Sequence, residues 1–115
     1  MIVSHLKEVK GLKYDNPAVK NVLKKVLVSP NEGWDGWVMR VFELGEGGYS
    51  PKHSHPWPHI NYMISGQGIL HIDGQDYEVE EGSFSFVPGQ KEHQFKNRGE
   101  EPFVFICIVP EEGDV

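Results

Sequence analysis

Apolar and polar residues alternate in short runs along most of this chain, from Trp37 to Val109. The runs are rich in Val, Ile, Phe and Tyr, which is typical of β-strands with one buried face. Turn residues end them at intervals of about ten residues, and Asp73 followed by Gly74 is a strong hairpin signal. The pattern predicts an all-β domain with strands over residues 37–44, 59–64, 69–72, 77–79, 83–87, 93–97 and 103–109.

The part of the chain before Trp37 has a less uniform pattern. Residues 1–9 alternate weakly, which favours an edge strand, and residues 10–17 contain Gly11 and Pro17, which favour a connection. Residues 18–27 carry apolar side chains at helical spacing after a candidate cap at Asn16. Residues 25–28 are instead rich in strand formers and precede a turn over residues 29–33. Helix and strand therefore both stay open for residues 18–25.

Composition and charge limit the class of protein. With 115 residues the chain has room for one domain, residues 1–115. A net charge of -6 and the lack of a Lys/Arg cluster argue against nucleic acid and anionic membrane partners. No apolar run approaches the ~20 residues that cross a bilayer, and the first residues lack the apolar core of a secretory signal. Because Cys107 is also the single cysteine, we expect a cytoplasmic protein.

Four of the six histidines have spacings that suit a metal site. The two histidines of the His-Ser-His segment fall on the same face of an extended chain. A Pro-Trp-Pro kink then lets a third come from a neighbouring strand, and a fourth begins the strand after residue 92. Neutral imidazole is the commonest metal ligand, and uncoordinated imidazoles would leave donors unpaired in an apolar barrel. We expect one divalent transition-metal ion bound by His53, His55, His59 and His93.

This spacing resembles the two motifs of the cupin superfamily, small β-barrels that hold a metal in the barrel mouth. The resemblance covers about residues 37–109. Two positions depart from the motifs: His59 replaces a glutamate, and Gln90 replaces a glycine, which predicts a slightly different turn before His93. The matching residues are Gly47, His53, His55 and Gly66 in the first motif and Gly82, Pro88, His93 and Asn97 in the second.

The sequence is more narrowly similar to the compact, single-domain four-histidine cupins, through its His-Ser-His-Pro-Trp-x-His segment and its C-terminal Cys-x-x-Pro-x-Glu-Gly. That resemblance implies a cupin-type β-barrel, or double-sheet jelly roll, with a strand over residues 22–28. It also implies a homodimer formed through N-terminal strands, so residues 1–36 would supply those strands, a connection and a dimer arm. Members of known activity bind manganese and can cleave alkenes oxidatively. Manganese enters only through the resemblance, because nitrogen ligands by themselves suit Zn, Cu, Fe and Ni.

Arg40 is unusual among the apolar residues of its strand. It either pairs with an acidic residue at the rim or meets an anionic substrate. Asn61, Asn97 or backbone carbonyls could orient the metal-binding histidines, whereas His5 and His71 are expected to face solvent. The other candidates for the pocket wall, for which a plain core role is equally open, are Trp57, Met63, Phe95, Phe105 and Cys107.

Three functions are compatible with such a site. Four neutral ligands would leave the ion its full charge, and the remaining coordination positions suit both oxygenase and Lewis-acid chemistry. The leading hypothesis is a metal-dependent dioxygenase that acts on a small organic substrate. The alternatives are a non-catalytic module that binds a small anion or sugar, and a metal-dependent isomerase or epimerase, which would need a general base. Metal affinity is expected to fall as the pH drops through ~6.5, because imidazole must be neutral to bind.

Overall fold

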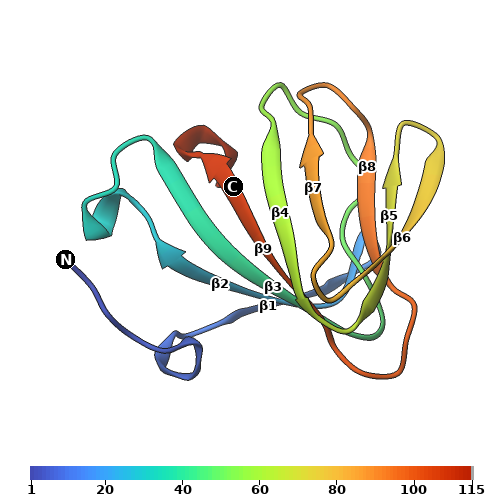
Figure 1. Cartoon of the computed structure of the whole chain (residues 1–115), viewed down its shortest axis with the longest axis horizontal. Coiled ribbons are helices and arrows are strands. Elements are labelled where there is room, and N and C mark those ends of the chain that lie inside the picture. The colour runs from blue at the N-terminus through green and yellow to red at the C-terminus, as the bar shows by residue number, and fades with distance from the viewer. Residues whose placement is uncertain (115) are drawn as a thin grey trace.

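The computed structural model describes residues 1–114, which form nine strands and three short 3₁₀ turns (Figure 1). The predicted all-β class is confirmed. Among these residues no helix has the length and apolar character that a membrane span requires. The elements are η1 (Leu6–Glu8), β1 (Leu12–Asn16), β2 (Val19–Val28), η2 (Pro30–Glu32), β3 (Trp37–Tyr49), β4 (His59–Ser65), β5 (Gln67–Ile72), β6 (Gln75–Glu80), β7 (Phe84–Val87), β8 (His93–Asn97), β9 (Phe103–Pro110) and η3 (Glu111–Gly113).

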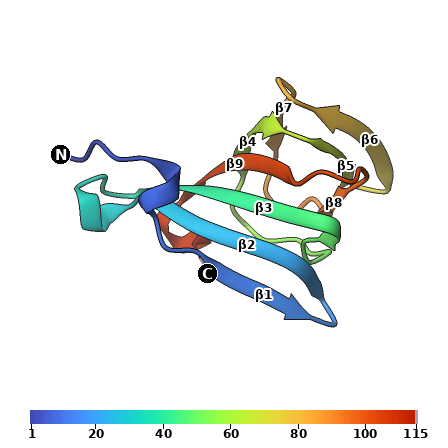
Figure 2. The same cartoon turned by 90° about the horizontal axis from the view of Figure 1, so that it is seen from below.

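The strands form one continuous sheet that folds back on itself as a jelly roll. Its order is β6-β5-β8-β3-β9-β4-β7, and β2 and then β1 extend the sheet beside β3. Figure 2 shows β1, β2, β3 and β9 as one layer, with β4 to β8 gathered beside it. The long strand β3 connects the two parts, because it pairs with β2 and β9 along most of its length and with β8 at Tyr49. The predicted barrel is therefore confirmed.

The N-terminal residues differ from the sequence-based prediction. The expected edge strand over residues 1–9 is wrong, because this part contains only the 3₁₀ turn η1. The expected connection over residues 10–17 contains strand β1, which pairs with β2 from Leu12 to Asn16. A polar segment such as this one can form a strand when a neighbouring strand pairs with it, and the sequence pattern does not show that pairing.

Residues 19–28 form strand β2, which includes the strand over residues 22–28 that the resemblance implied. Strand β2 pairs with β1 on one side and with β3 on the other, so both of its edges are hydrogen-bonded. Val22 and Lys24 alternate with more exposed residues and are both buried. The hydrogen bonds that β2 makes with two neighbouring strands thus favour the extended conformation. The helical spacing of its apolar residues would by itself stabilise only an amphipathic helix with one packed face.

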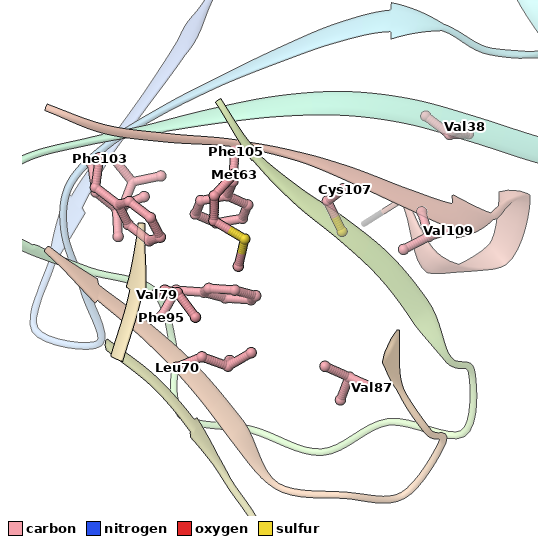
Figure 3. Close-up of a cluster of buried hydrophobic side chains, with 12 residues drawn as sticks. Val38, Met63, Leu70, Val79, Val87, Phe95, Phe103, Phe105, Cys107 and Val109 are labelled. Atoms are coloured by element: carbon pink, nitrogen blue, oxygen red, sulfur yellow. The ribbon is translucent and has the colours of Figure 1, made fainter. Parts of the chain in front are cut away.

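The hydrophobic core lies between the two layers (Figure 3). Three phenylalanines are in contact in it: the rings of Phe95 and Phe105 are stacked with centroids 4.3 Å apart, and those of Phe103 and Phe105 are tilted with centroids 5.2 Å apart. Such stacking contributes stability beyond the burial of apolar area. The other core residues that Figure 3 labels are Val38, Met63, Leu70, Val79, Val87, Cys107 and Val109.

The Asp-Gly hairpin is present as predicted. It joins β5 to β6, with Ile72 and Gln75 paired directly on either side. Asp73 and Gly74 have φ angles of 49° and 85°, and positive φ at both central residues is the feature of the tight turns that match the twist of a hairpin.

Candidate metal centre

Two of the predicted ligands meet because the chain beyond β3 continues alongside β8. After Tyr49 pairs with Lys96, the N–H of Ser50 donates to the Phe95 carbonyl at 2.9 Å, and a bridge then joins His53 and His93. The backbone N–H of each of these histidines donates to the carbonyl of the other, at 3.1 Å and 2.9 Å. Segments 40 residues apart in sequence are thereby held in register, and their imidazoles lie 4.8 Å apart between ring centroids.

His55 is held by the turn that precedes β8. The N–H of Gln90 donates to the His55 carbonyl at 2.7 Å. The sequence predicted an altered turn because Gln90 replaces a glycine, but Gln90 itself adopts the left-handed backbone conformation, with φ of 70°. That conformation costs a non-glycine residue about 1 kcal/mol. Glycine is required at position 89 for a different reason, because a side chain there would collide with the carbonyl of Pro56.

Three of the four imidazoles are oriented by acceptors at Nδ1. His55 bonds the Trp57 carbonyl at 2.7 Å, His93 bonds the Lys91 carbonyl at 2.9 Å, and His59 bonds Oδ1 of Asn61 at 2.7 Å. Because these oxygens can only accept, Nδ1 carries the hydrogen in each ring, and Nε2 of the neutral ring presents a lone pair. The predicted orienting role is thus filled by Asn61 and two backbone carbonyls.

Asn97, the other candidate for that role, has a different partner set. Its Nδ2 donates to the carbonyls of Leu44 and Glu101, both at 2.9 Å, and its Oδ1 accepts from the N–H of Gly99 at 2.8 Å. It therefore fastens the end of β8 to the end of β3 and does not orient a histidine.

The ligating atoms of three predicted ligands form one cluster, and His59 lies beside it. Those of His53, His55 and His93 all lie within 4.8 Å of one another, and this cluster could hold a metal ion. Nε2 of His59 lies 3.1 Å from Nε2 of His93. Two neutral imidazoles whose lone pairs face each other repel unless a cation lies beside both. Nitrogens at adjacent positions of one ion, each ~2.1 Å from it, are about 3 Å apart, so this spacing fits a shared metal.

The local environment favours neutral imidazoles. Burial, and then the nearby His93, lower the pKa of His59 from 6.5 to about 3, although the bond to Asn61 opposes this. Partial burial and the neighbouring His93, His55 and Arg40 lower the pKa of His53 to about 4. Burial also lowers the pKa of His93. Protons therefore compete with a metal for His53 and His59 well below the pH of ~6.5 expected from the sequence, because the folded protein disfavours imidazolium at these sites.

A cavity of about 380 Å³ adjoins the histidines. All four predicted metal ligands line it, as do five of the six other candidates, namely Arg40, Trp57, Phe95, Phe105 and Cys107. Met63 is the exception: its side chain is fully buried and packs in the core beside Phe105 (Figure 3). The ring of Trp57 stacks on His55, with centroids 4.7 Å apart and an interplanar angle of 9°.

Part of the wall comes from N-terminal residues that the sequence analysis did not single out. Tyr14 of β1 and Val19, Val22 and Lys24 of β2 line the cavity, and Gly113 of η3 contributes to it. Val22 and Lys24 occur two positions apart, so they share a face of the strand. Strand alternation could have placed them together, but the pairing of β2 with β3 is what turns that face toward the histidines.

Arg40 is buried inside the cavity and does not reach the rim. Its Nη2 donates to Sγ of Cys107 at 3.1 Å, and its Nη1 lies 3.7 Å from a carboxylate oxygen of Asp114. The acidic partner foreseen for Arg40 therefore exists, at the C-terminal end of the described chain. Burial raises the pKa of the Cys107 thiol, which keeps it protonated at neutral pH despite Arg40.

The histidines expected to face solvent lie outside the cluster, although the side chain of His71 is only 17% exposed. Nδ1 of His71 lies 2.7 Å from a carboxylate oxygen of Asp76 on the face of β5 opposite Leu70, which is buried. His5 accepts the N–H of Lys7 at 3.0 Å and caps the exposed turn η1.

The family model described as Cupin domain matches residues 40–109, which is more than half of the chain. A relative from Rhodospirillum rubrum, 1-methylthio-D-xylulose 5-phosphate methylsulfurylase, is 32% identical over 95 residues. That match covers 83% of this chain and 60% of the relative. The dimethylsulfoniopropionate lyase DddW of Ruegeria pomeroyi is 34% identical over 56 residues, or 49% of this chain and 37% of the relative. The chain thus spans at most 60% of the length of either relative.

Solved structures of the same architecture exist. The polyketide cyclase RemF from Streptomyces resistomycificus superposes with a TM-score of 0.89 at 27% identity, covering 96% of this chain and 80% of that one. A cupin-2 domain protein from Rhodospirillum rubrum superposes with a TM-score of 0.86 at 27% identity, covering 99% and 77%.

Proposed function

This chain belongs to the cupin domain family, and on that premise we propose that it is a metal-dependent enzyme that acts on a small organic substrate, with dioxygenase chemistry as the leading reaction class. The observation that carries the proposal is the convergence of imidazole Nε2 atoms whose Nδ1 atoms are already bonded. A cation among these lone pairs would relieve their mutual repulsion. The adjoining cavity has the volume of a small-molecule site.

We assign His53, His55, His59 and His93 as the ligands of one divalent transition-metal ion. Imidazole ligands suit Fe, Zn, Ni and Cu, and the resemblance to four-histidine cupins favours Mn. When bound, the ion would supply Lewis acidity and, if it is redox-active, a means of using dioxygen. The chain's own contribution is to fix three of the four rings: Asn61 and the carbonyls of residues 57 and 91 hold their orientation.

The lining of the cavity supports oxygenase over isomerase chemistry. An isomerase or epimerase needs a general base near the substrate. Among the described residues that line the cavity there is no aspartate or glutamate. Glu43 lies within 4.0 Å of Lys25, on the face of β3 that points away from Arg40. The two curated relatives are named for reactions of small organic molecules, which supports the substrate class.

The test combines metal loading with oxygen uptake. The protein is purified metal-free, loaded separately with Mn, Fe, Zn, Ni and Cu, and offered alkenes, phenols and diketones in an oxygen electrode. We expect uptake that requires both a redox-active metal and a substrate, and that a His93→Ala variant lacks. His71→Ala is the matched control. Absence of uptake with every metal and substrate would remove the dioxygenase assignment.

A non-catalytic binding module is the second candidate, and one observation favours it. Arg40 places a buried positive charge beside the metal site, which suits retention of a small anion. Tight ligand binding by the metal-loaded protein without turnover, measured by calorimetry and product analysis on the same sample, would establish this alternative.

For partners, we propose a second copy of this chain. The outer faces of β4 and β7 expose a patch of large apolar side chains, which we call the outer patch: Ile60, Tyr62, Ile64, Phe84 and Phe86. Phe84 and Phe86 are 79% and 62% exposed. The exposed parts of such side chains amount to on the order of 500 Å², a large share of the ~800 Å² per partner in a standard interface. The expectations of no nucleic acid or membrane partner and of a cytoplasmic location stay predictions.

Light scattering after size exclusion tests the dimer. We expect the wild-type chain to have twice its mass of 13.1 kDa and a Phe84→Lys/Phe86→Lys variant to be monomeric. Tyr77→Lys, at another exposed aromatic residue, is the control. The resemblance predicted N-terminal strands as the interface, so Leu12→Lys in β1 is the competing variant. Dissociation by Leu12→Lys alone would move the interface there, and a wild-type monomer would contradict both versions.

A further inference from the structure

Arg40 has an incomplete set of partners for a buried guanidinium. The residue is 8% exposed and lines the cavity together with the four histidines. Its Nη2 donates to the Cys107 sulfur at 3.1 Å, and its guanidinium carbon lies 5.0 Å from the centroid of the Phe42 ring. Within residues 1–114 its Nε is buried and has no hydrogen-bond acceptor. Buried polar atoms in folded proteins nearly always have partners, so this donor requires an explanation.

Among residues 1–114, the acceptors close to Arg40 compensate its charge only weakly. A thiol sulfur is a poor acceptor compared with a carboxylate. The nearby carboxylate, that of Asp114, is 3.7 Å from Nη1 but only 2.7 Å from Nζ of Lys24. A buried charge without good compensation is unfavourable, and binding of an oxyanion would relieve that cost. Arg40 is therefore better suited to an anionic ligand than to a purely structural ion pair.

The shape and walls of the cavity indicate which anion fits. A guanidinium matches the planar oxygens of a carboxylate with two parallel hydrogen bonds. Much of the remaining wall is aromatic or aliphatic, and the apolar residues in it include Val22, Phe42, Trp57 and Phe105. A phosphate would need several further donors, whereas a carboxylate on an apolar body is satisfied by one arginine and apolar walls.

We propose that Arg40 binds the carboxylate of a small, mostly apolar organic acid in the cavity, with the other end of the acid toward the histidines. This proposal names the substrate class of the site proposed above and rests on the cavity being its ligand site. Burial makes the role specific to Arg40, because Arg98, the other arginine of the chain, is exposed and is not part of the cavity wall.

Nitrogen-15 NMR tests the contact directly in the folded protein. The chain has only two arginines, so an Arg98→Met variant retains a single arginine Nε–H signal, from Arg40. Benzoate is the probe, and benzamide, of nearly the same shape and uncharged, is its control. We expect the Arg40 signal to shift on titration with benzoate and to stay in place with benzamide. An unmoved signal at saturating benzoate overturns the proposal without any need for an Arg40 variant.

Calorimetry separates the arginine from the metal. Dissociation constants of benzoate, benzamide and inorganic phosphate are measured on metal-free and zinc-loaded protein. We expect benzoate to bind at least about tenfold more tightly than benzamide in both forms, and Arg40→Met to remove that preference while Arg98→Met keeps it. Arg40→Lys, which keeps the charge but not the planar fork, should lose most of it.

Three other outcomes of these measurements would each decide part of the proposal. A benzoate preference that appears only with zinc and survives Arg40→Met assigns the anion to the metal and overturns the role of Arg40, while the proposed metal site stands. Tighter binding of phosphate than of benzoate overturns the carboxylate assignment. If no metal binds but the benzoate preference persists and depends on Arg40, the carboxylate site stands and the proposed enzyme function fails.

Discussion

Strands β4 and β7 have two faces of opposite character. Their inward residues include His59 and Asn61, which are 4% and 1% exposed, and the part-buried Ser85. The outer patch lies on the other side of the same two strands, where Phe84 is 79% exposed. In most sheets with one solvated face the apolar side chains are inside and the polar ones outside. On β4 and β7 the arrangement is partly inverted, because polar side chains face inward and large apolar side chains face outward. The two features have different causes.

The inward polar residues are stable because they satisfy one another. Oδ1 of Asn61 accepts from His59 at 2.7 Å and from the Ser85 hydroxyl at 3.2 Å, and its Nδ2 donates to the Ile106 carbonyl at 3.4 Å. A fully bonded polar network is tolerated in an interior, whereas isolated polar groups are not. The inner face therefore accommodates a buried histidine. The outer face exposes apolar area that association with another chain would cover.

Removing a metal ligand should produce the largest effect. We expect His93→Ala to weaken binding of a divalent metal on the order of a thousandfold, because even residues that only orient ligands are worth about 10- to 100-fold. The measurement is competition against a chelator of known affinity. His71→Ala, which removes a histidine outside the site, should bind as the wild type does. Equal affinities for the two variants would show that the cluster does not bind the ion.

Substitutions at two adjacent positions on β4 should differ sharply in their effect on the free energy of unfolding. Met63→Ala removes a fully buried side chain and should lower the free energy of unfolding by about 3 kcal/mol. Ile64→Ala, at a side chain that is 37% exposed, should cost less than about 1 kcal/mol. Both substitutions belong in the monomeric Phe84→Lys/Phe86→Lys background, so that association does not contribute to denaturant unfolding curves. Similar losses would mean that the two faces are not distinct.

The inner polar network should affect metal affinity without taking part in ligation. We expect Asn61→Leu to weaken metal binding about 10- to 100-fold, since His59 loses the acceptor that holds its ring. Asn61→Asp keeps an acceptor at that position and adds a negative charge, so it should bind the metal at least as well as the wild type. Equal weakening by both substitutions would point to general damage and not to ring orientation.

Acid should destabilise the metal-free protein through the same face. The pKa of His59 is about 3 in the folded protein and 6.5 as the ordinary value. Between these values the unfolded chain binds a proton that the folded chain does not, so stability falls as the pH drops below 6.5. We expect His59 to contribute a loss on the order of 2 kcal/mol between about pH 7 and 5. Denaturant unfolding of the wild type and of His59→Gln measures it, and the same pH slope in both would assign the loss elsewhere.

The sequence predicted most of the strands because they follow local rules, and it indicated the histidine cluster through the spacing of its residues. Alternation places successive side chains on opposite faces, and the Asp-Gly turn sets its own hairpin register. His53, His55 and His93 form a cluster that could hold a metal ion, and the full set of four ligands stays a prediction. The assignment of residues 22–28 to a strand came from the family resemblance, since the local pattern also suited a helix.

Other features depend on pairing between distant segments, which no local pattern contains. Strand β1 forms because β2 supplies its hydrogen bonds, and Lys24 reaches the cavity because β2 pairs with β3. Met63 and Phe105 both looked like wall candidates, yet only Phe105 lines the cavity. The chain alone thus determines which face of each strand a side chain occupies, through backbone geometry. Only the tertiary structure decides what that face meets, because strand order and register bring together residues such as Arg40, Cys107 and Asp114.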